Sequence, residues 1–323
     1  MSTNILILNQ DHYNHVNATL IEGLSKIKDE YDIKLYCNSP HNYSYAPNKH
    51  DYTIYDMSIF ERLWDKCDII VMPNNFVINS DSIDLKVLNE KGVYLDTNDY
   101  AENLSDPEHF PLYLKREYAL KDRYHENVFP FCFGAEDRYF YGGQNFLKIW
   151  EEKNSSLACM MGLGDHRPWR TIIQRGLSDK YWKREDMQIG SLYGDNDNSN
   201  IITNDRNHGL FFEQLLDSKI SVDSYGAGKA TNTGRFFESL ACGCALFYQP
   251  INIDFPDGFI DGEDIIIYKS MIDLLNKVDN YLSNPSLLKS IAEASFEKTK
   301  LFHTTKVRAE YFVKLCSMKG LIK

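Results

Sequence analysis

The sequence predicts an α/β protein with two Rossmann-like domains that face each other across a cleft. Its 323 residues are the length of two domains of ordinary size. Short apolar runs alternate with segments of helical periodicity, which is typical of right-handed βαβ units and open parallel sheets. A charged, aromatic stretch interrupts this alternation once, and the alternation then starts again. The two halves are therefore expected to fold in the same way.

The first half opens with the apolar run 4–8, the expected first strand, and continues with a helix near 16–29 whose apolar residues lie on one face. The nearly continuous apolar run 68–73 is typical of a strand that a parallel sheet buries on both faces. The other strands predicted in this half cover residues 32–37, 52–56, 92–96 and 127–133. The other helices predicted there cover residues 57–66, 81–90 and 111–122.

The second half restarts with a strand at 156–162, and Pro168 lies near the first position of the helix that follows. A glycine-rich loop separates the strand 218–224 from a short helix and a strand that ends at Tyr248. The other strands predicted in this half cover residues 187–193 and 264–268. The other helices predicted there cover residues 208–217, 270–283, 285–299 and 303–318.

These elements divide the chain into four parts. We expect an N-terminal Rossmann-like domain at 1–134, a connector at 135–155 and a C-terminal Rossmann-like domain at 156–302. The last helix, within 303–323, is expected to pack back on the N-terminal domain. Parallel sheets of this kind bind ligands at the carboxyl ends of their strands, so the expected site lies in the cleft between the two sheets.

The composition narrows the class of protein. The formal net charge is −11 and the pI about 5.3, which argues against the nucleic acid backbone as the main source of binding affinity. No stretch approaches the ~20 apolar residues of a membrane span. The N-terminus lacks the features of a secretory signal, and the seven cysteines are scattered. We therefore expect a cytoplasmic protein with reduced thiols and no stable membrane insertion.

The segment 221–248, SVDSYGAGKATNTGRFFESLACGCALFY, carries the strongest functional signal. It reads as a strand, a glycine-rich loop, a short helix and a second strand. Backbone N–H groups and the positive end of a helix bind phosphate, cations neutralise it, and a carboxylate binds sugar hydroxyls. The residues expected to bind a ligand of this kind are Gly226, Gly228, Lys229, Thr233, Arg235 and Glu238.

Two common nucleotide motifs are missing from the chain. A Walker loop requires a glycine where Asp223 stands and a serine or threonine where Ala230 follows Lys229. A GxGxxG dinucleotide fingerprint does not follow the first strand. The sequence therefore gives little support to a nucleotide hydrolase or a dinucleotide-dependent dehydrogenase.

Three stretches in order carry a resemblance to a known family: GAGKATNTGRFFESLACGCALF, then DGEDIIIY, then YLSNPSLLKSIAEASFEKTKLFHTTKVRAEYF. They resemble the C-terminal half of glycosyltransferases with the two-Rossmann GT-B fold, in particular family-4-like enzymes and the spore-maturation glycosyltransferase-like group. Asn284-Pro285 and His303-Thr304 fit a helix break and a helix start of that group. The resemblance covers residues 155–320, and the N-terminal half matches only in fold pattern.

The resemblance implies a nucleoside diphosphate sugar donor, UDP-linked, in the C-terminal domain. Glu238 would bind hydroxyls of its ribose or sugar, and Arg235 with the 226–234 loop would face it. Arg167 and Arg170 lie where the family places cations against the diphosphate. The chain departs from the family at Ala230, where family-4 enzymes often carry a second glutamate.

The catalytic groups are expected on both sides of the cleft, with Glu238 on the donor side. An inverting transfer needs a base for the acceptor proton, and the N-terminal domain normally supplies acceptor-side groups. Its candidates at strand ends are Asp11, His12 and Asp99, together with Asp96. Helix capping by Asp11 or His12 and an Asx turn at Asp99 are the simpler alternatives.

Other polar residues suggest no cofactor. Lys115 and Arg116 fall on the predicted helix 111–122 and read as a solvated face. No DxD-like pair lies where a metal-dependent transferase would need one, so we expect a metal-independent reaction in which cations and a helix end stabilise the leaving diphosphate.

The acceptor stays open among a glycan, a protein and a modified DNA base. Two alternatives to the main interpretation remain. One is a phage-type DNA-base glycosyltransferase. The other is a catalytically inactive GT-B-like protein that serves as a binding or scaffold subunit.

Overall fold

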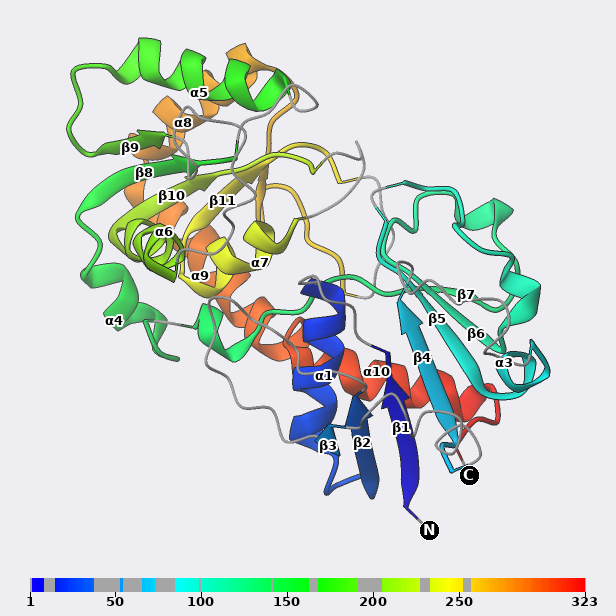
Figure 1. Cartoon of the computed structure of the whole chain (residues 1–323). Helices are drawn as coiled ribbons and strands as arrows, with labels where there is room; N and C mark the ends of the chain where they lie inside the picture. Colours follow the sequence, from blue (N-terminus) through cyan, green and yellow to red (C-terminus); the bar gives the residue numbers. More distant parts are fainter. Residues whose placement is uncertain are drawn as a thin grey trace.

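The structure is a computed structural model with two parallel sheets on opposite sides of the molecule (Figure 1). It describes residues 2–8, 15–37, 53–54, 66–73, 85–98, 100–140, 142–162, 168–190, 205–226, 233–251 and 257–322. The predicted helix 57–66 falls almost wholly outside this part of the chain. The two Rossmann-like sheets predicted from the sequence are confirmed.

The first sheet has the strand order β3-β2-β1-β4-β5-β6-β7, and all neighbouring strands are parallel. Apolar residues of the central strands β1 and β4 are buried, as their apolar runs predict. The strands are β1 (Thr3–Ile7), β2 (Ile33–Cys37), β3 (Thr53–Ile54), β4 (Ile69–Pro73), β5 (Gly92–Asp96), β6 (Leu112–Lys115) and β7 (Val128–Pro130). Among the described residues, the helices of this half are α1 (His15–Ile27) and α3 (Leu85–Lys91), with short 3-10 turns η2 (Pro107–His109) and η3 (Lys121–Arg123).

One predicted element of this half is wrong. Residues 111–122 do not form a helix, because 112–115 pair with β5 as strand β6. The apolar spacing of PLYLKREY fits either element, and the partner strand decides between them. Lys115 can lie in the buried strand because its Nζ donates to Asp96 Oδ2 at 2.8 Å and to the carbonyl of Glu102. Reading Lys115 and Arg116 as a solvated face was also wrong, since Lys115 is fully buried and the Arg116 side chain is 10% exposed.

The second sheet has the order β12-β11-β10-β8-β9, again with parallel neighbours. Its strands are β8 (Ser155–Met160), β9 (Met187–Gly190), β10 (Ser218–Val222), β11 (Ala245–Tyr248) and β12 (Ile266–Ile267). Its helices are α5 (Pro168–Tyr181), α6 (Asp205–Asp217), α7 (Gly234–Ala241), α8 (Met271–Leu282) and α9 (Pro285–Phe302). As predicted, β10 is followed by the short helix α7, while residues 227–232 of the glycine-rich segment lie outside the described part of the chain.

The chain crosses between the sheets twice. The first crossing contains the 3-10 turn η4 (Asp137–Tyr139), and helix α4 (Phe146–Glu151) follows it within the predicted connector. The second leads from α9 into α10 (Thr305–Met318). The crossings are paired: Ala135 N–H donates to the His303 carbonyl at 2.6 Å, and Thr305 N–H donates to the Ala135 carbonyl at 3.1 Å. The predicted domain boundaries themselves stay a prediction.

His303 is fully buried at the second crossing. Arg308 Nη2 lies 2.7 Å from its Nδ1, and the carbonyl of Asp257 lies 2.9 Å from its Nε2. An arginine only donates, so Nδ1 accepts and Nε2 carries the proton that the carbonyl accepts. Burial, reinforced by the charge of Arg308, lowers the pKa of His303 to about 2. This imidazole is therefore neutral.

Helix α10 returns to the first sheet and lies against α1 (Figure 1). The two helices touch most closely at Gly23, where an added Cβ would stand 2.1 Å from the Thr305 carbonyl oxygen and 2.8 Å from Ala309 Cβ. Only a glycine permits this approach. None of the helices that the structure describes is long and apolar enough to cross a lipid bilayer.

Gly23→Ala is expected to force α1 and α10 apart. Because the added methyl would meet backbone rather than a flexible side chain, we expect a loss of about 2–3 kcal/mol in the free energy of unfolding. Urea denaturation of the purified protein measures it. Ser25→Ala on the same helix, whose hydroxyl bonds only within α1, is the control and should change stability by about 0.5 kcal/mol or less. Equal stability of the Gly23→Ala variant and the wild type would contradict the packing described here.

Candidate functional site

The candidate site lies where the carboxyl ends of the two sheets face each other, which is where parallel sheets bind ligands. On the second sheet it comprises the ends of β8 and β10 and the N-terminus of α7. On the first sheet it comprises the N-terminus of α1 and the end of β6.

Asp223 anchors the second-sheet side of the site. It follows β10 directly and is 2% exposed. Its Oδ1 accepts hydrogen bonds from Arg235 Nε at 3.2 Å and Nη2 at 2.9 Å, and its Oδ2 accepts one from Thr233 Oγ1 at 2.8 Å. Its carbonyl accepts a hydrogen bond from the Tyr268 hydroxyl at 2.8 Å. Asp223 therefore fixes the first turn of α7 to the end of β10. The only sign of this role in the sequence is an acidic residue at the end of a buried strand.

Arg235 belongs to α7 and pairs with Asp223 rather than standing as an isolated cation. Burial alone would lower the pKa of Arg235, but the adjacent Asp223 carboxylate outweighs it and raises the pKa. The guanidinium thus keeps its charge, and much of that charge is balanced within the protein. The predicted contact of Arg235 with a donor stays a prediction.

Glu238 lies one turn further along α7 and is 2% exposed. Burial raises the pKa of Glu238 to about 7, with the nearby charges of Arg138 and Arg235 acting in the opposite direction. Glu136 and Asp223 raise it further. Near neutral pH this carboxyl is therefore divided between its two forms and can accept or donate a hydrogen bond.

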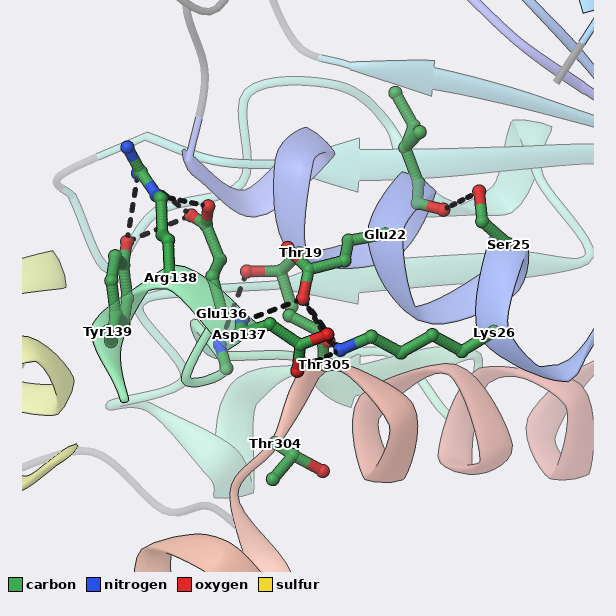
Figure 2. Close-up of polar contacts among 12 residues, drawn as sticks. Thr19, Glu22, Ser25, Lys26, Glu136, Asp137, Arg138, Tyr139, Thr304 and Thr305 are labelled. Carbon is green, nitrogen blue, oxygen red and sulfur yellow. Dashed lines mark hydrogen bonds and ion pairs between the residues drawn. The ribbon is translucent and has the colours of Figure 1, made fainter. Parts of the chain in front are cut away.

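The charges around Glu238 come partly from the first crossing. Arg138 Nε donates to Glu136 Oε2 at 2.7 Å, and its Nη2 lies 3.4 Å from the Tyr139 hydroxyl (Figure 2). The Cys242 thiol donates to the Tyr139 carbonyl at 3.5 Å, which holds α7 on η4. The sequence analysis placed residues 136–139 in a connector and gave them no part in the site. Their charged, aromatic composition was the available signal that they surround Glu238.

Arg170 bridges two loops of the second sheet. It is 1% exposed. Its Nη1 donates to the carbonyl of Gly162 at 3.1 Å, and its Nε and Nη2 donate to that of Tyr225 at 3.2 and 2.6 Å. These contacts hold together the segments that follow β8 and β10, so they favour a structural role. The predicted diphosphate contact of Arg170 stays a prediction, as does the predicted donor contact of Gly226, which follows Tyr225 in the chain.

The remaining predicted site residues lie outside the part of the chain that the structure describes. They are Asp11, His12, Asp99, Arg167, Gly228 and Lys229.

The N-termini of α1 and α7 meet across the site. A Cβ added to Gly234, the first residue of α7, would lie 3.4 Å from Nδ1 of His15, the first residue of α1. The His15 ring stands edge-on to Phe133 with 5.9 Å between centroids, and the Arg116 guanidinium carbon lies 5.2 Å from the Phe133 centroid. Two helix N-termini and a guanidinium favour a negatively charged ligand. Sequence reasoning missed His15, whose position at the start of the first helix was the available signal.

The end of the first sheet carries a buried polar cluster. The Asp96 carboxylate accepts hydrogen bonds from Lys115 Nζ at 2.8 Å, the Tyr113 hydroxyl at 2.6 Å and the Asn98 N–H at 3.1 Å. These contacts occupy Asp96 in the structure of the strand ends, so it is a weak candidate for a base. Burial raises the pKa of Glu117 to about 7 despite the adjacent Arg116 and Lys115.

The described residues contain no group of three or more histidine, cysteine, aspartate or glutamate side chains that could hold a metal ion. The predicted metal independence nevertheless stays a prediction.

Comparisons with known proteins give a partial family match and several similar folds. Residues 193–314 match the profile of a family described as glycosyl transferase-like. No curated protein matches the sequence. Several solved structures share the fold. A glycosyltransferase from Rickettsia africae ESF-5 has a TM-score of 0.64 and 12% identity, with 98% of each chain covered.

Two further structures contain bound nucleotide. Anabaena HepE in complex with UDP and glucose has a TM-score of 0.58 and 9% identity, covering 97% of this chain and 99% of its own. An α-glucosyltransferase in complex with UDP-glucose and DNA containing an abasic site has a TM-score of 0.63 and 11% identity, covering 98% and 99%. The chain therefore has the GT-B fold, and residues 193–314 match a glycosyl transferase-like profile.

The raised pKa of Glu238 predicts a specific dependence of stability on pH. Between its ordinary value of about 4.5 and about 7, the folded state holds a proton that the unfolded chain has released. Stability therefore falls as the pH rises through this window. Glu238→Gln removes this fall, so the variant should gain about 1–3 kcal/mol relative to the wild type between pH 5 and pH 8.

Urea unfolding at the two pH values measures this difference. Glu117 acts in the same direction in both proteins and cancels in the comparison. Glu263→Gln, at an exposed position, is the control and should leave the dependence of stability on pH unchanged. Parallel stability curves for Glu238→Gln and the wild type would show that the Glu238 carboxyl is ionised like an exposed one.

Proposed function

We propose that this GT-B protein is a glycosyltransferase that moves a sugar from a nucleoside diphosphate sugar, UDP-linked, to an acceptor. The observation that carries the proposal is the placement of Glu238. It lies near the start of α7, at the carboxyl end of the second sheet, within the segment that matches a glycosyl transferase-like family. Two structures with the same fold contain UDP or UDP-glucose, which supports the choice of nucleotide.

The proposed site divides the reaction between its two sides. The diphosphate would lie at the N-terminus of α7, where the end of the helix attracts negative charge. Glu238 would bind a ribose or sugar hydroxyl of the donor. As the bond to the sugar breaks, negative charge grows on the leaving diphosphate, and cationic side chains and helix ends that are already in place stabilise it.

The acceptor would enter from the first sheet, and its hydroxyl would lose a proton to a base there if the reaction inverts configuration. Asp11, His12 and Asp99 remain our candidates for this base. The protein is proposed to act in the cytoplasm.

A DNA base is a second candidate for the acceptor. The observation that favours it is the likeness to the α-glucosyltransferase whose structure contains DNA. The net charge of −11 opposes it, because affinity for DNA comes largely from cations that neutralise phosphates. A glycan or protein acceptor is therefore the main proposal.

Glu238→Ala is expected to abolish most donor turnover. The variant loses the carboxylate that would accept a hydrogen bond from a hydroxyl of the donor sugar or ribose, so we expect kcat/KM to fall about 10- to 100-fold. Release of UDP from UDP-sugars, with and without a panel of acceptors, measures it. Glu263→Ala, at an exposed position of the same half, is the matched control.

Binding is measured separately by thermal unfolding with nucleoside diphosphates. A ligand at 100 times its Kd should stabilise the wild type by about 2.7 kcal/mol. A wild type that no nucleoside diphosphate or nucleotide sugar stabilises would overturn the proposal. Undiminished binding and turnover by Glu238→Ala would overturn the role of Glu238.

Metal independence is tested by chelation. Because the proposed stabilisation of the diphosphate comes from helix ends and cationic side chains, turnover should persist in excess EDTA. Adding magnesium or manganese to the chelated enzyme should change kcat little. Loss of turnover in EDTA, with recovery on adding either metal, would assign the stabilisation to a bound cation instead.

A further inference from the structure

The first crossing forms hydrogen bonds with one face of α1. Thr19 Oγ1 donates to the His15 carbonyl at 2.9 Å and accepts from the Gly134 N–H at 3.2 Å. One turn along the helix, Glu22 Oε1 accepts from the Asp137 N–H at 2.9 Å. Two positions of α1, three residues apart, therefore hold two positions of the crossing that are also three residues apart. The segment 134–139 is fixed in register with α1.

Glu22 is the centre of this contact (Figure 2). Its carboxylate is 3% exposed, and Oε1 accepts three hydrogen bonds. Besides the Asp137 N–H, the donors are Lys26 Nζ at 2.6 Å and Thr305 Oγ1 at 2.9 Å. Because Thr305 begins α10 after the second crossing, one carboxylate oxygen joins α1 to both crossings.

Lys26 closes the network. Its Nζ also lies 2.7 Å from Asp137 Oδ1 and 2.8 Å from Thr305 Oγ1. The ammonium thus contacts the same three elements as Glu22: α1, the first crossing and the start of α10. A buried carboxylate held by a cation and two further donors has one favoured geometry, since any displacement leaves a charged oxygen without its donors.

The segment that Glu22 holds also reaches the candidate site. Asp137 points toward Glu22 and Lys26, whereas its neighbours Glu136 and Arg138 lie on the other side of the turn (Figure 2). Arg138 is the leading charge that opposes the burial of Glu238, and η4 contacts α7. A movement of Asp137 relative to α1 would therefore move the charges that surround Glu238.

Helix α1 itself also reaches the candidate site, at its N-terminus. Glu22 is seven residues from His15, the residue of α1 that lies against Gly234 of α7. An α-helix is stiff over two turns, so the orientation fixed at Glu22 is carried to His15. One buried carboxylate therefore fixes the positions of groups on both sides of the candidate site.

We propose that Glu22 is a positioning residue for sugar transfer: it fixes segment 134–139 and α1 relative to each other, and so places Glu238 opposite the acceptor side of the site. The inference rests on the proposed function and assigns to Glu22 no contact with substrate. Donor binding, which involves mainly the second sheet, should not depend on it. Transfer, which requires both sides in the correct arrangement, should.

The test compares Glu22→Ala and Glu22→Gln with the wild type. The alanine variant removes the acceptor oxygen, and the glutamine variant keeps an acceptor for Asp137 and Thr305 but loses the ion pair with Lys26. Glu30→Gln is the matched control, because Glu30 pairs with Lys306 of α10 at 3.8 Å between the same parts of the chain but in solvent. Calorimetric titration with UDP and steady-state turnover of UDP-sugars are measured below the unfolding temperature of every variant.

We expect Glu22→Ala to keep the Kd for UDP and to lower kcat about 10- to 100-fold, since small displacements of reacting groups cost rates of this size. Glu22→Gln should recover part of the loss, and Glu30→Gln should match the wild type. An unchanged kcat in Glu22→Ala would overturn the proposal. So would a parallel loss of UDP affinity and kcat, which indicates general disruption of the fold.

Hydrogen exchange separates this proposal from the proposed function. If the wild type neither binds UDP nor turns over UDP-sugars, the proposed function fails, and the exchange rates then decide on Glu22 alone. Coupling through segment 134–139 predicts faster exchange in Glu22→Ala at the Asp137 amide and also at the amides of α7. Faster exchange at Asp137 without any change in α7 would overturn the positioning role.

Discussion

Helix α10 packs on α1 at a point where only the hydrogen of Gly23 separates the helix from the backbone of Thr305. This close approach governs much of the architecture. It brings the Thr305 hydroxyl within reach of Glu22 and aligns the second crossing with the first, so that Ala135 pairs with both His303 and Thr305. A side chain at position 23 would widen the gap and separate these groups together. The arrangement of the two sheets therefore depends on a steric condition at one residue of α1.

Several buried carboxylates near the boundary between the halves are paired with a cation. Removing two charges from water costs several kcal/mol each, and their attraction repays this only where hydrogen bonds satisfy the remaining groups. Such pairs add little net stability, but separating the partners is costly, so they define a geometry. Examples among the described residues are Glu22–Lys26, Asp96–Lys115, Glu136–Arg138 and Asp223–Arg235. Three of them lie at or next to the candidate site, where a defined geometry matters most.

The sequence was a good guide where apolar periodicity determines structure, and a poor one where a distant partner does. Strand β4 is recognisable from its apolar run alone, because both faces of a central parallel strand are buried. Strand β6 is not, because Lys115 becomes acceptable in a strand only once Asp96 of the neighbouring strand is beside it. Asp223 is a similar case, since its partners Thr233 and Arg235 follow a loop whose path the sequence does not state.

The candidate site shows the same division. The position of Glu238 in a short helix after the glycine-rich loop followed from local pattern. Its surroundings did not, because Arg138 and Glu136 come from a crossing about 100 residues earlier in the chain. Arg170 was predicted from its position after β8, but its hydrogen bonds to backbone carbonyls could not be read from the sequence.

The neutral imidazole of His303 has a consequence for how the protein responds to acid. With its Nδ1 accepting from Arg308, the ring stays unprotonated down to a pH of about 2, and the second crossing carries no histidine switch. Among the residues that the structure describes, two buried carboxylic acids have a pKa of about 7, Glu117 on one sheet and Glu238 on the other. A bell-shaped or sigmoidal rate profile with a midpoint near neutrality would ordinarily be assigned to histidine. In this protein Glu238 can produce the same midpoint, and the charge that it gains as the pH rises is a negative one.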